Sequence, residues 1–495
     1  MNFLVDICKI NKEGNPNNTA VITERCTLSY SELQKESVEA AGILLNSGVV
    51  KDDYVPVLCE NNKDFIILVL ALWLIDAVPV PINIKLTQKE IEQLLLISKS
   101  KKIFVHENLW KSPPDGRAGI PVGKDNFAGL PKIIFPLDKN DEKNFSIASS
   151  NDINRTAVVI FTSGSTAAPK GVMLSFKNLI RSAEIGNQIL NQTSKDRWLA
   201  SLPFYHIGGF SIITRALLYG ASLIIPTSSD TKDFVKCIAK FKPSLASFVS
   251  TQLKRLLDNK IKPNQELRNV LLGGGFVDDE LISSAVQNGW KIIKVYGSSE
   301  TSSFVSALAF NEIKIKGNSV GKVLFPNKIK IVDENRKTLP AGVSGEIVVM
   351  SDSVMKGYLN NEEETVKRLA DGHYFTGDIG RLDDDGYLFI EARRSDLIIT
   401  GGENVNPLEI ENAILQHKKI RECCVVGLEN KTWGHIVAAA VVPADTKMNK
   451  TEITKFLQGK LAGYKIPKKF LFVDKLPENA LGKIEKEKVK NLFRE

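Results

Sequence analysis

The sequence of 495 residues has no hydrophobic run long enough to cross a bilayer. Its longest apolar stretch extends from Phe65 to Ile75 and ends at Asp76, whereas a membrane-spanning helix needs about 20 apolar residues. The stretch Met1–Asp6 also lacks the basic segment and apolar core of a secretory signal. We therefore expect a cytoplasmic protein with a buried helix at residues 65–75.

Metal-binding and disulfide patterns are absent as well. The six cysteines form no Cys-x-x-Cys pair, and none of the five histidines lies near a cysteine at metal-ligand spacing. Cys423 and Cys424 are adjacent in a strand-like run, so their side chains should point to opposite faces of a sheet. These observations predict packing cysteines in a reducing compartment.

The charge excess is small for so long a chain. The 65 basic and 57 acidic side chains leave a formal net charge of +8. The densest basic cluster, Lys99–Lys102, has no interleaved aromatic residues and no accompanying nucleic-acid motif, which favours a solvated surface. We expect no nucleic-acid partner, while a weakly cationic surface suits small anionic ligands.

Strand-like and helix-like segments alternate along the first part of the chain. Tyr54–Leu58 and Ala77–Ile84 have strand patterns, and they flank a helical pattern at Lys63–Ile75. This alternation favours an α/β fold with parallel sheets. The stretch Ser112–Asn151 is rich in Pro, Gly, Asp and Lys and predicts little regular structure.

The chain is long enough for more than one domain. Alternation resumes at Thr156, and strand patterns separated by turns occur at Lys328–Asp333 and Gly345–Met350. We expect residues 1–394 to form a large α/β domain of stacked sheets with a small β-rich subdomain. Residues 395–495 should form a small α+β domain.

The loop Thr162–Gly171 carries the strongest chemical signal. It follows a β-branched strand, Val158–Phe161, and is dense in hydroxyl groups before it reaches Lys170. Backbone N–H groups and hydroxyls can donate to phosphate oxygens, and the ammonium can offset charge as pyrophosphate leaves. The loop is not a Walker motif, because Pro169 and Gly171 stand where that motif needs a glycine and a hydroxyl residue.

This loop resembles the signature T-S-G-[ST]-T-G-x-P-K-G of the adenylate-forming superfamily, which includes acyl-CoA synthetases, luciferases and peptide-synthetase adenylation domains. Ala167 replaces the usual glycine, and a positive φ there would cost alanine roughly 1–2 kcal/mol. Further motifs follow in order along nearly the whole chain. The resemblance implies the adenylate-forming-enzyme fold, a carboxyl-terminal domain that rotates between half-reactions, and use of ATP, Mg²⁺ and coenzyme A.

The segment Val295–Thr301 resembles the Y-G-x-T-E motif of that superfamily. The resemblance places Tyr296 near adenine, the Ser299 hydroxyl near the α-phosphate, and Glu300 on Mg²⁺, a hard cation that prefers oxygen ligands. The glycine-rich turn Leu271–Phe276 would lie beside the nucleotide and the acyl pocket. A tight strand-to-helix turn explains its glycines equally well.

A third motif, Tyr374–Asp378, is followed by Asp383, Gly386 and Arg393 and implies a ribose site. Asp378 would accept hydrogen bonds from both ribose hydroxyls, and Arg393 would contribute from the other side. The nucleotide-binding set that the resemblance implies is Thr162, Ser163, Gly164, Ser165, Thr166, Gly274, Tyr296, Gly297, Ser299, Asp378, Arg393 and Gly402.

The carboxyl-terminal region continues the resemblance. Ser395 falls at the hinge, and Thr400–Val405 would line the pantetheine channel in the thioester-forming pose. The run Leu476–Lys483 resembles L-P-x-x-x-x-G-K, whose lysine reaches the reacting carboxylate and the α-phosphate. Like charges oppose carboxylate attack on ATP, so Lys170 and Lys483 are the expected electrostatic catalysts.

The segment Ser201–Ser211 matches the region that gates the acyl pocket. It lacks the aspartate that amino-acid-activating relatives carry there, which counts against amino acid substrates. His206 is a further candidate in the catalytic centre, as a pocket wall rather than a base. The implied pocket residues are His206, Ser211, Arg215, Gly273 and Gly297.

Within the superfamily, the chain resembles the o-succinylbenzoate–CoA ligases of menaquinone synthesis. The stretches that carry this likeness are Asp196–Leu199, Leu202–Ser211, Arg393–Ile399, Thr432–Gly434 and Gly463–Lys468. The chain departs from those ligases at Ser298, Ser299 and Phe276.

That substrate carries a second carboxylate, which needs a cation or polar donors when buried. Ser211 and Arg215 would share one helix face and could hold it. An Arg215 paired with a structural acid is an equally open interpretation.

These motifs predict a two-step acid–CoA ligase. Carboxylate plus MgATP gives acyl-AMP and pyrophosphate, and the CoA thiol then displaces AMP. The alternatives are another aryl- or acyl-CoA ligase, an enzyme that loads a carrier protein, and a catalytically inactive ligand-binding relative. The expected partners are a small carboxylic acid, ATP and CoA; a homodimer stays open.

Overall fold

The computed structural model contains two compact units, each described by itself. Unit 1 comprises Met1–Lys328 and Val349–Tyr374, and unit 2 comprises Ile329–Val348 and Phe375–Glu495. The expected domain boundary at residues 394 and 395 lies outside the described residues and stays a prediction. The structure describes residues 17–84, 86, 88–107, 109, 126–127, 130–135, 152–162, 169–274, 279–393, 398–400, 403–430, 433–444, 448–458, 460–461, 463–479 and 482–494.

The largest sheet of unit 1 has nine strands in the order β16-β15-β14-β13-β12-β10-β11-β1-β2. From β14 to β1 neighbouring strands run parallel, and antiparallel strands lie at both edges. The strands are β1 (Thr19–Ile22), β2 (Thr27–Ser29), β10 (Arg197–Leu199), β11 (Ser222–Ile224), β12 (Leu245–Phe248), β13 (Asn269–Leu272), β14 (Ile292–Tyr296), β15 (Ser306–Leu308) and β16 (Lys322–Val323). This arrangement confirms the expected parallel α/β fold.

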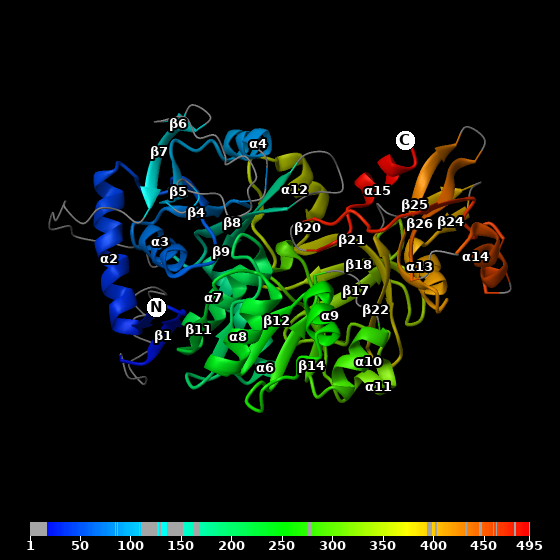
Figure 1. Cartoon of the computed structure of the whole chain (residues 1–495). Coiled ribbons are helices and arrows are strands. Elements are labelled where there is room, and N and C mark those ends of the chain that lie inside the picture. The colour runs from blue at the N-terminus through cyan, green and yellow to red at the C-terminus, as the bar shows by residue number, and fades with distance from the viewer. Residues whose placement is uncertain are drawn as a thin grey trace. The chain divides into compact units, whose positions relative to one another are not determined.

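Helices alternate with these strands along the chain and lie around the sheet (Figure 1). They are α6 (Phe176–Leu190), α7 (Ile207–Tyr219), α8 (Thr231–Phe241), α9 (Ser250–Asp258), α10 (Asp279–Gln287) and α11 (Ile313–Lys316), with a 3₁₀ turn, η2 (Ser299–Thr301). The side chain of Ser175 caps α6 by accepting a hydrogen bond from the backbone N–H of Asn178. Almost all of α7 is buried, so this helix belongs to the core.

A second sheet of unit 1 has the order β4-β3-β5-β7-β6, and a third has the order β19-β9-β8. Their strands are β3 (Tyr54–Leu58), β4 (Val78–Pro81), β5 (Ile103–His106), β6 (Asn126–Phe127), β7 (Leu130–Phe135), β8 (Thr156–Thr162), β9 (Lys170–Ser175) and β19 (Gly357–Tyr358). The accompanying helices are α2 (Tyr30–Asn46), α3 (Lys63–Leu74), α4 (Gln88–Ser98) and α12 (Glu362–Arg368), and α12 runs into β20 (Leu369–Ala370).

The expected buried helix is confirmed as α3, whose residues Phe65–Trp73 are all buried. Asn62 caps it by accepting a hydrogen bond from the N–H of Phe65. The prediction of little regular structure in 112–151 is wrong at β7, which pairs in parallel with β5. Pro131 argues against a strand when only the local sequence is considered. Strand β7 forms because its backbone pairs with β5, which no local sequence pattern shows.

Unit 2 contains the expected β-rich segment and a carboxyl-terminal α+β part. The first is built from β17 (Lys328–Val332), β18 (Gly345–Met350), β21 (His373–Leu382) and β22 (Leu388–Arg393). The second contains β23 (Ile398–Thr400), β24 (Glu403–Val405), β25 (Ile420–Asn430), β26 (Gly434–Pro443) and β27 (Lys469–Phe472), with α13 (Pro407–Leu415), α14 (Lys450–Leu457) and α15 (Lys486–Leu492).

Cys423 and Cys424 lie in β25 and belong to two different hydrophobic clusters. One cluster contains Ile410 and Ile453, and the other contains Val489. The two cysteines therefore point to opposite faces of the sheet, as their adjacency in a strand predicts.

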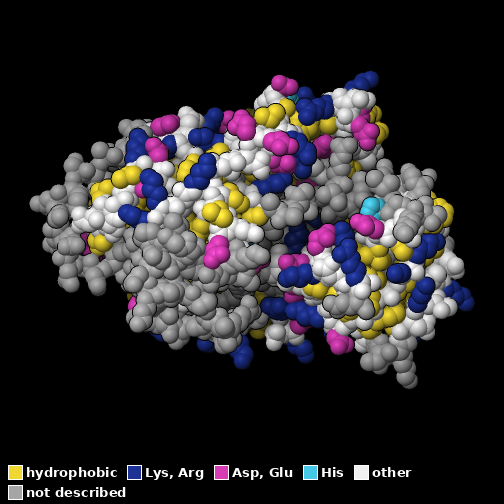
Figure 2. Space-filling model, turned by 90° about the horizontal axis from the view of Figure 1, so that it is seen from above, with side chains coloured by type: hydrophobic (Ala, Val, Ile, Leu, Met, Phe, Trp, Pro, Cys, Tyr) yellow, Lys and Arg dark blue, Asp and Glu magenta, His cyan; other side chains and the backbone are white. Residues whose placement is uncertain are grey.

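The surface carries mixed charge. On the face shown in Figure 2, basic and acidic side chains are interspersed rather than gathered by sign. Within the expected solvated cluster, Lys101 pairs with Asp53 at 3.1 Å. In the described ranges, no helix is long and apolar enough to span a membrane.

Candidate active site

The hairpin β8–β9 fixes both ends of the expected phosphate loop. Thr162 and Lys170 lie opposite each other in the antiparallel register, and the Thr162 hydroxyl donates to the carbonyl oxygen of Lys170 at 3.4 Å. The loop residues Ser163, Gly164, Ser165, Thr166 and Ala167 lie outside the described residues. The closed hairpin nevertheless sets where the loop begins and ends.

Lys170 is held by a carboxylate of the same unit. Its ammonium lies 2.7 Å from Oε1 of Glu364, and each side chain is only 16% exposed. Arg368 contacts the same carboxylate oxygen through Nε at 3.2 Å. Partial burial of Glu364 opposes ionisation, but hydrogen bonds from Lys170 and Arg368 outweigh it and lower the pKa of the carboxyl.

Glu300 lies next to this ion pair, joined to it by a tyrosine. The Tyr358 hydroxyl donates to Oε1 of Glu300 at 2.9 Å, and the Lys170 ammonium lies 5.5 Å from the centre of the Tyr358 ring. Burial and the negative charge of Glu300 together raise the pKa of Tyr358. The tyrosine therefore remains a hydrogen-bond donor to the carboxylate at neutral pH.

The surroundings of Glu300 fit the Mg²⁺ that the resemblance implies. The residue is 7% exposed and lies in η2, directly after β14. In the described part of the chain, no group of three or more acidic, His or Cys side chains could form a protein cage for a metal. A single buried carboxylate suits Mg²⁺, which keeps several waters and takes its remaining oxygens from substrate phosphates.

Several glycine and hydroxyl residues gather at the carboxyl ends of β13 and β14, which are parallel neighbours. A Cβ on Gly297 would lie 1.8 Å from the carbonyl oxygen of Ser303, and one on Gly273 would lie 2.7 Å from Val295. Gly274 has a φ of +87°, which favours glycine. At Gly273 and Gly297, atoms of the protein itself therefore leave no room for a side chain.

Tyr296 is the last residue of β14, Ser299 begins η2 three residues later, and both are half-buried. The carboxyl ends of parallel strands are where ligands bind in open α/β sheets. The structure therefore brings together Gly273, Gly274, Tyr296, Gly297, Ser299 and Glu300, as their common assignment to one site requires.

The helix α7 carries the three predicted pocket residues His206, Ser211 and Arg215. His206 occupies its N-cap position, and its ring lies 4.7 Å from that of Tyr205. The Ser211 hydroxyl donates back to the carbonyl oxygen of Gly208 at 3.2 Å. Ser211 and Arg215 are both 2% exposed, so the expected shared helix is confirmed.

Arg215 is a buried cation whose hydrogen-bonding capacity is incompletely used. Its guanidinium carbon lies 4.7 Å from the centre of the Phe304 ring. Nε and Nη2 have no hydrogen-bond partner among the described residues, and no described Asp or Glu raises the pKa of Arg215. Burial lowers the pKa of Arg215 to about 9. The alternative of a structural acid on Arg215 therefore finds no support in the described ranges.

In unit 2, the two residues expected at the ribose lie opposite each other. Asp378 in β21 and Arg393 in β22 are direct partners in the antiparallel register. The backbone N–H of Asp378 donates to the Thr376 hydroxyl at 3.0 Å within β21. Asp383 instead closes the β21–β22 turn, where it accepts hydrogen bonds from the N–H groups of Asp385 and Tyr387.

The remaining expected residues of unit 2 are only partly described. Lys483 is exposed in a turn, where its N–H donates to Oδ1 of Asn479 at 3.0 Å. Gly402 and the hinge residue Ser395 lie outside the described residues. In α15, Lys488 and Lys490 pair with acids three residues earlier, as expected for an exposed basic tail.

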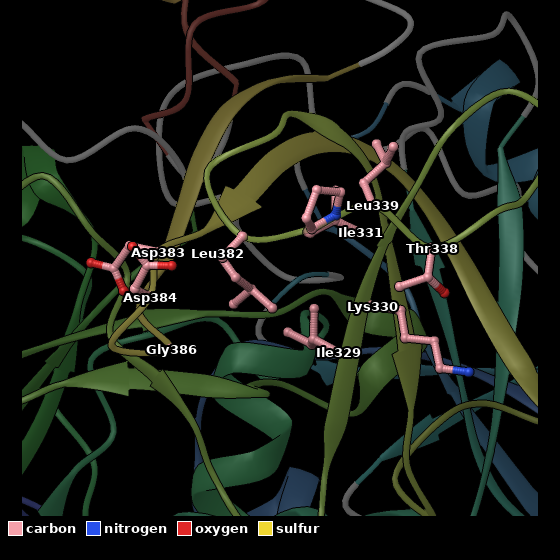
Figure 3. A pocket seen from close by; sticks show the side chains of 11 residues that line it. Ile329, Lys330, Ile331, Thr338, Leu339, Leu382, Asp383, Asp384 and Gly386 are labelled. Atoms are coloured by element: carbon pink, nitrogen blue, oxygen red, sulfur yellow. The ribbon is translucent and has the colours of Figure 1, made fainter.

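A cavity of about 280 Å³ in unit 2 contains none of the predicted site residues except the turn residues Asp383 and Gly386. Figure 3 shows its apolar side chains, including Ile331, Leu339 and Leu382, with Asp383 to one side. Its charged and hydroxyl side chains are Lys330, Thr338, Asp383 and Asp384, and apart from Asp383 none of these belongs to the motifs that predict the site. We therefore do not assign the chemistry to this cavity.

The motif search did not identify Tyr358, Glu364 or Arg368. Glu364 is the third of three consecutive glutamates at the start of α12, and only the fold shows which of them faces Lys170. The spacing of Glu364 and Arg368 is the one local signal, since residues four apart on a helix can pair.

Comparison with known proteins gives consistent results. The chain is 33% identical over 96% of both lengths to 2-succinylbenzoate–CoA ligase of Listeria monocytogenes, and 34% identical over 96% of this chain and 97% of the relative to that of Bacillus licheniformis. Among solved structures, o-succinylbenzoate CoA synthetase of Bacillus subtilis with its acyl-adenylate intermediate is similar at a TM-score of 0.88 and 30% identity, covering 99% of this chain and 98% of that one. The same enzyme with ATP and magnesium ion also gives 0.88 at 30% identity, covering 100% and 99%.

The family patterns match in chain order. Residues 8–359 match the AMP-binding enzyme family, and residues 409–483 match the AMP-binding enzyme C-terminal domain. The first match contains Lys170 and Glu300, and the second ends at Lys483. The chain therefore belongs to the AMP-binding enzyme family.

Proposed function

We propose that the protein is an AMP-forming 2-succinylbenzoate–CoA ligase that acts in menaquinone synthesis. Full-length similarity to ligases of that name carries the proposal. The described site supports it, because the buried cation Arg215 in α7 and Lys170, which ends the expected phosphate loop, lie in the same unit. ATP, coenzyme A and the aromatic acid are its substrates.

In the first half-reaction, the acid carboxylate attacks the α-phosphorus of ATP and pyrophosphate leaves. Lys170 is the described cation best placed at the phosphate loop, because it ends that loop in β9. It would stabilise the charge that builds up on the departing phosphates. When bound, Mg²⁺ would supply further charge neutralisation between Glu300 and the phosphate oxygens.

The ribose is assigned to Asp378 and Arg393. Their cross-strand pairing supports this role, because one carboxylate and one cation at neighbouring positions can address both hydroxyls of a diol. Lys483 is assigned to the reacting carboxylate and the α-phosphate during adenylation. Lys483 lies in an exposed turn and ends the match to the AMP-binding enzyme C-terminal domain, which supports this assignment.

In the second half-reaction, the CoA thiol displaces AMP from the acyl-adenylate. We assign the pantetheine channel to the hairpin around Gly402 and the change of pose to a hinge at Ser395. This sequence of poses would expose the adenylate to the thiol only after pyrophosphate has gone. The two-domain division at residues 394 and 395 is part of the same proposal.

Arg215 is assigned to the second carboxylate of the substrate. An incoming carboxylate would give Nε and Nη2 the acceptors that they lack among described protein groups. Ser211, one turn earlier on α7, would contribute from the same helix face. The wall of this pocket would include His206, Gly273 and Gly297.

The test is ATP- and CoA-dependent pyrophosphate release across a panel containing o-succinylbenzoate, simple benzoates and fatty acids. We expect release with o-succinylbenzoate and detection of its CoA thioester by mass spectrometry. Preference for another acid would refute the substrate, and transfer to a carrier protein but not to CoA would refute the acceptor. A cytoplasmic location, a homodimer and the absence of nucleic-acid binding remain predictions.

A further inference from the structure

The ammonium of Lys170 already has an anionic partner within the protein. Glu364 lies 2.7 Å away, and both side chains are largely withdrawn from water. A phosphate oxygen that approaches this ammonium must share it with the carboxylate or replace the carboxylate. The ion pair is therefore in direct competition with the nucleotide that the proposed function requires.

Glu364 can give up Lys170 without losing all its partners. Arg368 contacts Oε1 at 3.2 Å, and Lys367 lies 4.0 Å from Oε2. A buried carboxylate left without a cation is costly, whereas one that keeps an arginine is not. Because Arg368 stays with Glu364, the free-energy cost of moving Lys170 from this carboxylate to a phosphate is small.

Tyr358 is a second neighbour of the Lys170 ammonium. The ammonium lies over this ring, and the ring hydroxyl is fixed on the carboxylate of Glu300. Glu364 and Tyr358 are therefore both in contact with Lys170, and Tyr358 also bonds the residue assigned to Mg²⁺. The ammonium is thus oriented before any nucleotide arrives.

We propose that Glu364 is a positioning residue that competes with polyphosphate for Lys170. The inference rests on the proposed use of ATP. In the empty site Glu364 orients the ammonium, and bound ATP then takes it over. After the chemistry Glu364 recaptures Lys170 and so favours the departure of pyrophosphate.

The direct test is Glu364→Gln, which removes the competing charge and keeps the size of the side chain. We expect the dissociation constant of MgATP, measured by calorimetry, to fall by about threefold to tenfold. The inhibition constant of pyrophosphate should fall by a similar factor, and KM for ATP should fall while kcat does not rise. The helix should remain folded, because its cap on the Glu364 N–H comes from Asn361.

Two controls separate this mechanism from a general change of charge. Glu363→Gln makes the same charge change one residue earlier, on an exposed side chain. It should leave both constants within experimental error of the wild type. In a Lys170→Ala background, Glu364→Gln should no longer tighten MgATP, because its effect depends on that lysine.

The outcomes are distinguishable. Tighter MgATP and pyrophosphate binding that disappears in the Lys170→Ala background supports the inference. Unchanged or weaker binding in Glu364→Gln, or tightening that persists without Lys170, overturns the inference alone. A wild-type protein that binds no MgATP overturns the proposed function and the inference together.

Discussion

Replacing Arg215 with methionine should separate binding of the aromatic acid from protein stability. Arg215 is fully buried in α7 with two guanidinium nitrogens that lack described partners, and burial lowers its pKa to about 9. A buried cation of this kind costs free energy in the empty protein. If it is retained for a substrate carboxylate, its removal should weaken substrate use and leave the fold intact.

The size of the effect follows from the two free donors of Arg215. Each charge-assisted hydrogen bond contributes about 1.5 kcal/mol, so two contribute about 3 kcal/mol. That corresponds to about a 100-fold loss in kcat/KM for o-succinylbenzoate. KM for ATP should stay within about twofold, because Arg215 is not assigned to the nucleotide.

Pyrophosphate release measures the kinetic part, and a thermal melt measures the stability part. The melting temperature of Arg215→Met should equal or exceed that of the wild type, because an unpaired buried charge is replaced by an apolar side chain of similar length. A melting temperature several degrees lower with unchanged kcat/KM would refute the reasoning and give Arg215 a structural role. A substrate analogue that keeps the reacting carboxylate and lacks the second one should show no loss of kcat/KM, which provides the substrate control.

Three further predictions concern the carboxyl-terminal domain, the metal and the stability in acid. Lys483→Ala should abolish adenylate formation yet largely spare thioester formation from supplied acyl-adenylate; equal loss in both half-reactions would count against two poses. Glu300→Gln should raise the Mg²⁺ concentration for half-maximal rate by roughly tenfold, and an unchanged Mg²⁺ dependence would remove the metal role. Burial opposes ionisation of Asp196, but hydrogen bonds from Arg268 and Ser244 hold the pKa of this carboxyl below 3.8. The ionised carboxyl therefore stabilises the fold above pH 3.8, and this contribution is lost at lower pH. Asp196→Asn should lower the free energy of unfolding by about 2 kcal/mol at neutral pH and by progressively less on acidification. A difference in melting temperature from the wild type that stays constant across pH would contradict this.

The fold was predictable where local sequence decides structure. The run Tyr54–Leu58 became β3 and Gly345–Met350 became β18, because each alternates or continues apolar residues between turn signals. The helical pattern at Lys63–Ile75 likewise became α3, because its apolar run follows the capping residue Asn62. Strand β7 was not predictable, because it depends on pairing with a distant strand.

The same distinction between local sequence and distant contacts applies to the residues of the candidate site. Lys170, Glu300 and Asp378 could be predicted because each stands in a contiguous motif whose chemistry is local to the loop that carries it, and their roles stay predictions. The pairing of Lys170 with Glu364 joins residues 194 positions apart, and no spacing rule reaches so far. The empty hydrogen-bonding capacity of Arg215 is also a property of packing, and a sequence shows only that an arginine is present.

The charges around Lys170 explain why a second lysine should be needed in only one half-reaction. Glu364 pairs with Lys170 and Arg368, and Glu300 accepts a hydrogen bond from Tyr358, so the charges of these four largely buried ionisable side chains cancel before any ligand binds; Lys367 near Glu364 is mostly exposed. A magnesium–nucleotide complex and a carboxylate substrate both bring negative charge, and this neutral cluster cannot offset it. An added cation is then required while the two anions react. Once pyrophosphate has left, the acyl-adenylate carries less charge, so removal of Lys483 should matter little to the attack of the thiol.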